Sequence, residues 1–64
     1  MLEFIEYDTG EKIFINATFV AMLKCKKPDV TAIVFSFGET IDVRGSLESV
    51  QGILTVQQQR NRIQ

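Results

Sequence analysis

The spacing of apolar residues changes at Gly45-Ser46, and this change restricts the chain to a sheet followed by a helix. Before it, apolar side chains occupy alternate positions, as in Ile33, Phe35 and Phe37. After it, they recur three or four positions apart, at Leu47, Val50, Ile53, Leu54 and Val56. The first spacing is typical of strands and the second of one helix face. The sequence therefore predicts a mainly β fold that ends in a single helix.

The length of 64 residues allows one domain, with a sheet over residues 1–45 and a helix over 46–62. A chain this short buries only about 60% of the surface that its unfolded form exposes. Small domains often gain further stability from disulfides, metals or self-association. Cys25 is the only cysteine and histidine is absent, which excludes an internal disulfide and argues against a zinc site. We therefore expect a homo-oligomer without a metal or cofactor.

Charge and hydropathy favour a cytoplasmic protein. Seven basic and eight acidic side chains give a net charge of −1, so the chain has no general attraction to nucleic acid or anionic lipid. The longest apolar run, Phe19–Leu23, is too short to cross a bilayer. Residues 1–4 lack the positive and apolar regions of a signal peptide, and an unpaired cysteine suits a reducing compartment.

The strand pattern predicts about five short antiparallel strands in a strongly bent sheet or a small SH3-like barrel. Strands are expected at 2–7, 12–15, 30–37 and 40–44. Segment 17–27 is compatible with a helix or a strand, and its alternation favours a turn at 16–18 followed by a strand from about 19 to 26. The predicted core consists of Phe4, Ile13, Ile15, Val20, Ile33, Phe35, Phe37, Ile41, Val43, Leu47, Val50 and Leu54.

The C-terminal segment has the signals of a helix start. Ser46 can accept a hydrogen bond from a free amide of the first turn, and Glu48 places a negative charge there. Gly52 lies inside the helix, where glycine costs about 0.5–1 kcal/mol relative to alanine. We expect this cost to be offset by close packing at Gly52, or the helix to bend there.

The residue types argue against an enzyme. Lysines on both sides of Cys25 are a setting in which a thiol can be reactive, but no histidine is present to act as its base. Acidic side chains such as Glu39 and Asp42 lie on or beside predicted hairpins, where charged residues normally face water. We therefore predict a non-catalytic protein-interaction or accessory module.

Apolar side chains that the predicted sheet does not need are the candidate contacts. On the first strand, Ile5 and Tyr7 point away from Leu2 and Phe4. On the helix, Leu54 and Val56 lie on diverging faces. We predict that Ile5, Tyr7, Leu54 and Val56 mediate self-association and the binding of an unknown protein partner.

The alternative function is that of a small nucleic-acid-binding regulatory protein. If the strands pair suitably, Lys24, Lys26, Lys27 and Arg44 form a basic patch. Small β-barrels bind single strands with such patches and exposed aromatic residues. Here the phenylalanines fall mostly at core positions, and Tyr7 is the only tyrosine, so protein interaction is the leading hypothesis.

Several segments, in order, carry a resemblance to a known family: residues 10–16, Val20, 31–35, 38–43 and 46–50. This order of a glycine turn, a strand ending in Asn16, a strand pair around Gly38 and a helix beginning at Ser46 resembles the FlbD family of small flagellar proteins. The resemblance covers about residues 1–54 and implies a similar shape without catalytic residues. Residues 17–29 match poorly, and a glutamine-rich end replaces the basic helix end of the family.

A second group, the short RNA-binding translational regulators of the carbon-storage type, also ends a small sheet with a helix. The chain lacks their Gly-Glu start and the Ala-Pro segment before the helix.

Overall fold

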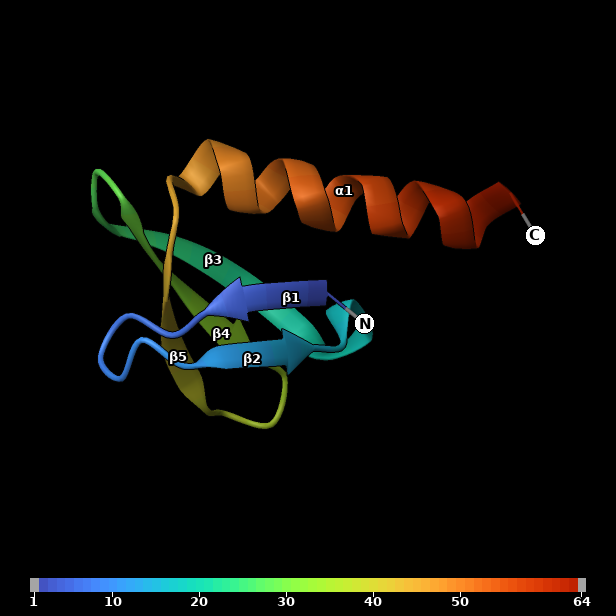
Figure 1. Cartoon of the computed structure of the whole chain (residues 1–64). Helices are drawn as coiled ribbons and strands as arrows, with labels where there is room; N and C mark the ends of the chain where they lie inside the picture. Colours follow the sequence, from blue (N-terminus) through green and yellow to red (C-terminus); the bar gives the residue numbers. More distant parts are fainter. Residues whose placement is uncertain (1, 64) are drawn as a thin grey trace.

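The computed structural model describes the backbone of residues 2–63 and the side chains of residues 2–56. In chain order its elements are β1 (Leu2–Ile5), β2 (Lys12–Ile15), the 3₁₀ helix η1 (Ala17–Phe19), β3 (Val20–Lys27), β4 (Val30–Phe35), β5 (Thr40–Arg44) and α1 (Leu47–Ile63). The fold is mainly β with one C-terminal helix, as the spacing of apolar residues predicts (Figure 1).

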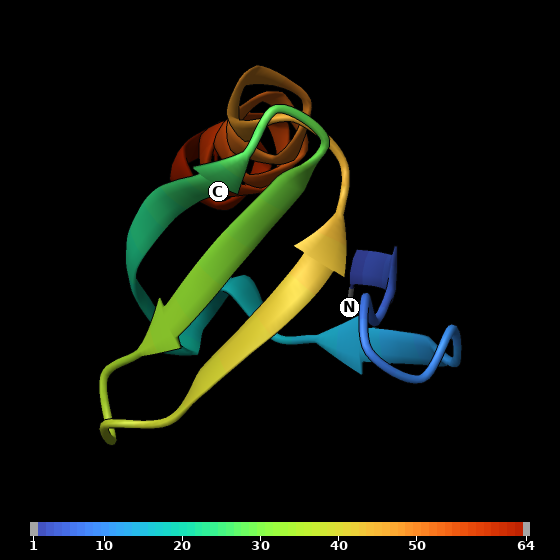
Figure 2. The ribbon, with the colours of Figure 1, turned by 90° about the vertical axis from the view of Figure 1, so that its left-hand side faces the viewer.

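The strands form two antiparallel sheets, the hairpin β1-β2 and the three-stranded sheet β3-β4-β5. One bridge between Glu6 and Val43 joins the end of β1 to β5, and the Tyr7 amide donates to the Asp42 carbonyl at 2.9 Å. Figure 2 shows the hairpin beside β5 and the helix on the side of β3. Within residues 2–63, β2 and β3 therefore remain as edges. The described strands form no closed barrel, so of the two predicted forms, a bent sheet or a small barrel, the barrel is not the one adopted.

The ambiguous segment after Asn16 is a turn followed by a strand. The Asn16 side chain accepts a hydrogen bond from the Thr18 amide at 3.0 Å and caps η1. The strand β3 then pairs with β4, with register shifts at Ala21 and Lys26. Each shift adds one residue to β3 and bends the strand locally. The predicted turn at 16–18 and strand from about 19 to 26 are confirmed.

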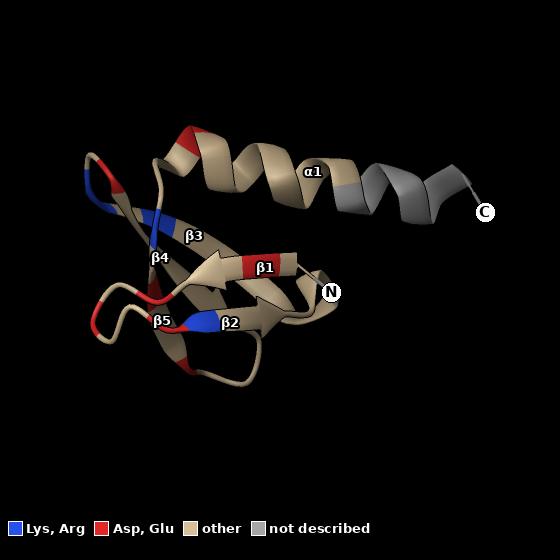
Figure 3. Ribbon diagram, in the orientation of Figure 1, with Lys and Arg blue, Asp and Glu red and all other residues tan. Residues whose placement is uncertain are grey.

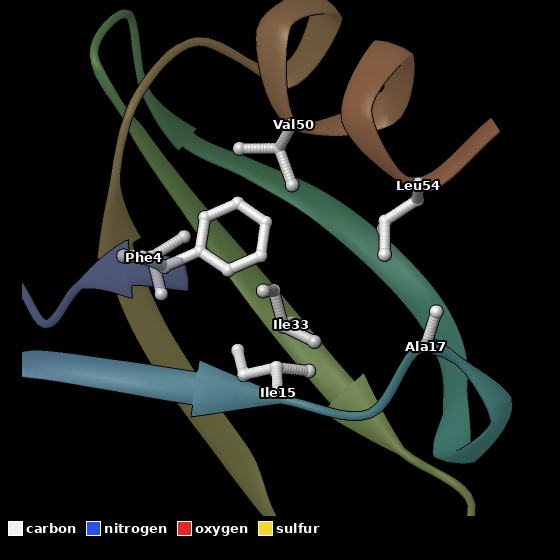
Figure 4. Close-up of a cluster of buried hydrophobic side chains, with 7 residues drawn as sticks. Phe4, Ile15, Ala17, Ile33, Val50 and Leu54 are labelled. Carbon is white, nitrogen blue, oxygen red and sulfur yellow. The ribbon is translucent and has the colours of Figure 1, made fainter. Parts of the chain in front are cut away.

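The core lies between the hairpin, the inner face of the three-stranded sheet and α1 (Figure 4). Its buried residues are Phe4, Ile15, Ala17, Ile33, Val43, Val50 and Leu54, and all except Ala17 belong to the predicted core. Phe37 is a correction, because 63% of its surface is exposed. It lies in the turn after β4, which ends at Phe35, so the alternation of apolar residues continues beyond the strand.

The helix begins as predicted, but Gly52 does not have the packing that we expected. The Ser46 hydroxyl accepts a hydrogen bond from the Ser49 amide at 3.2 Å. A Cβ atom added at Gly52 would meet no atom within 4 Å. Close packing within the described part of the chain therefore does not explain this glycine.

Candidate interaction surfaces

The outer face of the three-stranded sheet, which points away from the core, gathers the basic side chains. Lys27 pairs with Val30 and Val30 with Arg44, whereas Lys24 pairs with Ala32. Paired residues on neighbouring strands lie on the same face, as do residues two apart on one strand. Lys24, Lys27 and Arg44 therefore share this face, near the end of the sheet where β3 turns into β4 (Figure 3).

An ion pair crosses the central strand on this face. The Nζ atom of Lys26 on β3 lies 2.8 Å from Oδ2 of Asp42 on β5. Because Asp42 pairs with Ala32, the contact passes over Ala32, which is buried. The hydrogen bond and the negative charge of Asp42 raise the pKa of Lys26. The pair thus joins Lys26 to the outer face and covers part of β4.

A second contact, between Tyr7 and Lys27, crosses the same strand. The Lys27 ammonium donates to the Tyr7 hydroxyl at 3.2 Å and lies 5.1 Å from the centroid of the ring. Tyr7 follows the end of β1 beside β5, so its side chain reaches across the sheet to β3. Val30, between Lys27 and Arg44 in the ladder, is buried. Tyr7 therefore belongs to the basic outer face.

The predicted apolar contacts are not brought together. Leu54 is only 6% exposed and packs in the core, which confirms its place in the predicted core, whereas its role as a contact stays a prediction. Val56 is 57% exposed on α1, whereas Ile5 on β1 is half-buried. Ile53 is also exposed and lies three positions before Val56, which makes the two neighbours on one side of the helix. The helical phase explains this arrangement, because Val50 and Leu54 turn inward.

A groove of about 240 Å³ opens between β3 and α1. Its lining consists of Val20, Ala21, Met22 and Leu23 on β3 and Gln51, Leu54 and Thr55 on α1. Met22 is 50% exposed. Sequence reasoning did not identify this groove, because it depends on how the helix lies along the edge strand.

Phenylalanines form a further apolar surface at the end of the sheet. The rings of Phe35 and Phe37 stack with their centroids 5.3 Å apart, and Phe19 meets Phe37 edge to face at 6.3 Å. Phe19 and Phe37 are both exposed. The sequence predicts Phe35 and Phe37 in the core and Phe19 on a strand. Phe35 is partly buried against the core as predicted, whereas Phe37 is exposed and Phe19 lies in η1.

The lone cysteine and the acidic side chains do not come together as a metal site within the described residues. Cys25 is exposed, and its thiol donates to the Lys27 carbonyl at 3.6 Å. Among the described residues, no group of three or more His, Cys, Asp or Glu side chains is placed to hold a metal ion. No helix in this part of the chain is long and apolar enough to span a membrane.

No family model, curated protein or solved structure matches this chain. The resemblance to the FlbD family therefore stays a prediction, and the surfaces described above carry the functional argument.

Proposed function

We propose that this protein is a non-catalytic interaction module that acts through self-association and the binding of a partner protein. The supporting observation is the set of large apolar side chains left exposed: Tyr7, Phe14, Phe19, Met22, Phe37, Ile53 and Val56. Single exposed apolar residues are ordinary, whereas grouped ones mark contact surfaces. Ile53 and Val56 on α1 form one such group, and Phe19 and Phe37 form another.

Self-association is assigned to the exposed side of α1. Burial of Ile53 and Val56 against a second copy removes apolar surface from water at roughly 25 cal/mol per Å². It also supplies stability that a chain of 64 residues gains only in part from its own core. A charge placed at Val56 would have to be buried without a partner, which opposes association.

Light scattering on the full chain tests this function. We expect the wild type to have a mass above that of the monomer and Val56→Asp to be monomeric with an unchanged circular dichroism spectrum. Ile5→Asp tests the predicted contact on β1 in the same way. Thr55→Asp is the matched control, because it adds the same charge on the side of α1 that faces β3. A monomeric wild type at high concentration contradicts self-association.

Nucleic-acid binding is the second candidate, favoured by the shared outer face of Lys24, Lys27 and Arg44. It requires the four basic side chains, including Lys26, to contact phosphates. Fluorescence titration with random single-stranded DNA and RNA at low salt tests it, and binding should fall steeply as salt rises. Absence of binding at low salt rejects this candidate.

A further inference from the structure

We propose that β3 is a two-part docking surface for an extended acidic segment of a partner protein. One apolar side chain of the segment enters the groove between β3 and α1, and its carboxylates pair with the lysines at the other end of β3. This inference rests on the proposed function and names the chemistry of the partner.

The strand β3 is available because it lies at an edge. Within the described residues it pairs only with β4, although it is eight residues long. An edge strand presents backbone groups that can bind an added chain. The register shifts at Ala21 and Lys26 bend this edge, which disfavours unlimited sheet extension. Side-chain contacts on either side of the strand must therefore select the partner.

The first half of β3 supplies an uncharged anchor site. Val20 to Leu23 carry no charge, and they face Gln51, Leu54 and Thr55 across the groove. A concave site that combines apolar side chains with polar groups is typical of a binding pocket. The amide of Gln51 and the hydroxyl of Thr55 provide hydrogen-bonding groups on the helix side. An apolar side chain of the partner fits this site.

The second half of β3 supplies positive charge through Lys24, Lys26 and Lys27, and Arg44 lies in the same row as Lys27. The acidic group that contacts this cluster is Asp42, which pairs with Lys26; Asp8 adds a weaker field at Lys26. Complementary charge on a partner favours its encounter and fixes its register. Because successive side chains of an extended chain point to opposite faces, and the groove and the lysines lie on opposite faces of β3, the anchor and the carboxylates should be about three or five residues apart in the partner.

An acidic peptide suits this surface better than a nucleic acid does. The Asp42 carboxylate pairs with Lys26, so the separate charges of Lys24, Lys27 and Arg44 suit a few carboxylates better than a continuous phosphate backbone. Base stacking needs exposed aromatic rings, but Tyr7 on this face is engaged by Lys27.

Selection from a phage-displayed library of random dodecapeptides on the immobilised full chain tests the proposal. We expect enriched peptides to carry an apolar residue and an acidic residue about three or five positions apart. In anisotropy titrations with a selected peptide, we expect Lys24→Glu to weaken binding at least about tenfold. Met22→Asp places a charge in the lining of the groove and should also weaken binding of the peptide. Lys12→Glu on β2 is the matched control, because Lys12 lies beside Glu3 on the hairpin, and it should leave binding unchanged.

Three outcomes overturn the docking surface: no enrichment above the bare support, selected peptides without acidic residues, or equal weakening by Lys12→Glu. Tighter binding of an oligothymidylate than of the selected peptide also overturns it and assigns the face to nucleic acid. If the protein self-associates in light scattering but selects no acidic peptide, the docking surface is contradicted and the proposed self-association is not. Circular dichroism of each variant confirms that a loss of binding does not come from unfolding.

Discussion

The central strand β4 is buried on both faces, but its two faces are covered in different ways. On the inner face, Ile33 is 0% exposed and packs among apolar side chains from the hairpin and α1. On the outer face, Val30 and Ala32 lie beneath the Tyr7–Lys27 and Lys26–Asp42 contacts. Apolar packing determines the fold, whereas long polar side chains can separate from the sheet and meet another molecule. We therefore assign stability to the inner face, and we propose that the outer face and the edge of β3 bind the partner.

The largest effect should come from the inner face. Ile33→Ala leaves a cavity beneath the hairpin and should lower the free energy of unfolding by about 2–5 kcal/mol. Ile33→Val removes one methylene and should lower it by about 0.5–1.5 kcal/mol, so the effect remains measurable if the alanine variant does not fold. Urea denaturation gives both values. If Ile33→Ala lowered the free energy of unfolding by less than Tyr7→Ala does, the comparison between the two faces would be reversed.

An intermediate effect is expected from Tyr7 on the outer face. Tyr7→Ala uncovers Val30 and removes the contact of the ring with Lys27, which we expect to cost about 1 kcal/mol. Tyr7→Phe keeps the ring over the sheet and should cost less than Tyr7→Ala. Thermal denaturation of the two variants separates the contribution of the ring from that of the hydroxyl. A phenylalanine variant as unstable as the alanine variant would show that the hydroxyl, and not the ring, matters.

The smallest effect is the pH dependence of the Lys26–Asp42 pair. Asp42 raises the pKa of Lys26 above its ordinary value of 10.5. A group whose pKa is raised by folding stabilises the protein fully below its unfolded pKa, and this contribution disappears as pH rises through the folded pKa. The difference in melting temperature between wild type and Lys26→Met should therefore be constant near neutral pH and shrink above about pH 10.5. If the difference in melting temperature stays unchanged at high pH, the stabilisation comes from packing of the aliphatic part of the Lys26 side chain and not from its charge.

The sequence predicts the elements of this fold better than its surfaces. The spacing of apolar residues suffices for the strands and the helix, because burial of one face imposes a period on each element. The same rule misplaced Phe37, since alternation of apolar residues continues into a turn that no longer belongs to the sheet. Leu54 was predicted both in the core and as a contact, because the sequence alone does not say how far the core face of the helix extends; it is buried.

The sequence predicts the basic face only on the condition that the strands pair suitably. The positions of Lys24, Lys27 and Arg44 are visible in the sequence, but their sharing of one face depends on the register of β3, β4 and β5. The bulge at Lys26 and the contact of Tyr7 with Lys27 arise from tertiary structure, and local patterns contain no signal for them. The groove between β3 and α1 likewise depends on the packing of two elements distant in sequence.

Methyl chemical shifts measured by NMR over a dilution series test the division between fold and contact most directly. Self-association through α1 predicts that the methyl signals of Ile53 and Val56 move with protein concentration, whereas those of Ile33 and Val43 stay fixed. Signals that remain unchanged over the whole series, or core methyls that move as much as those on α1, would contradict the account.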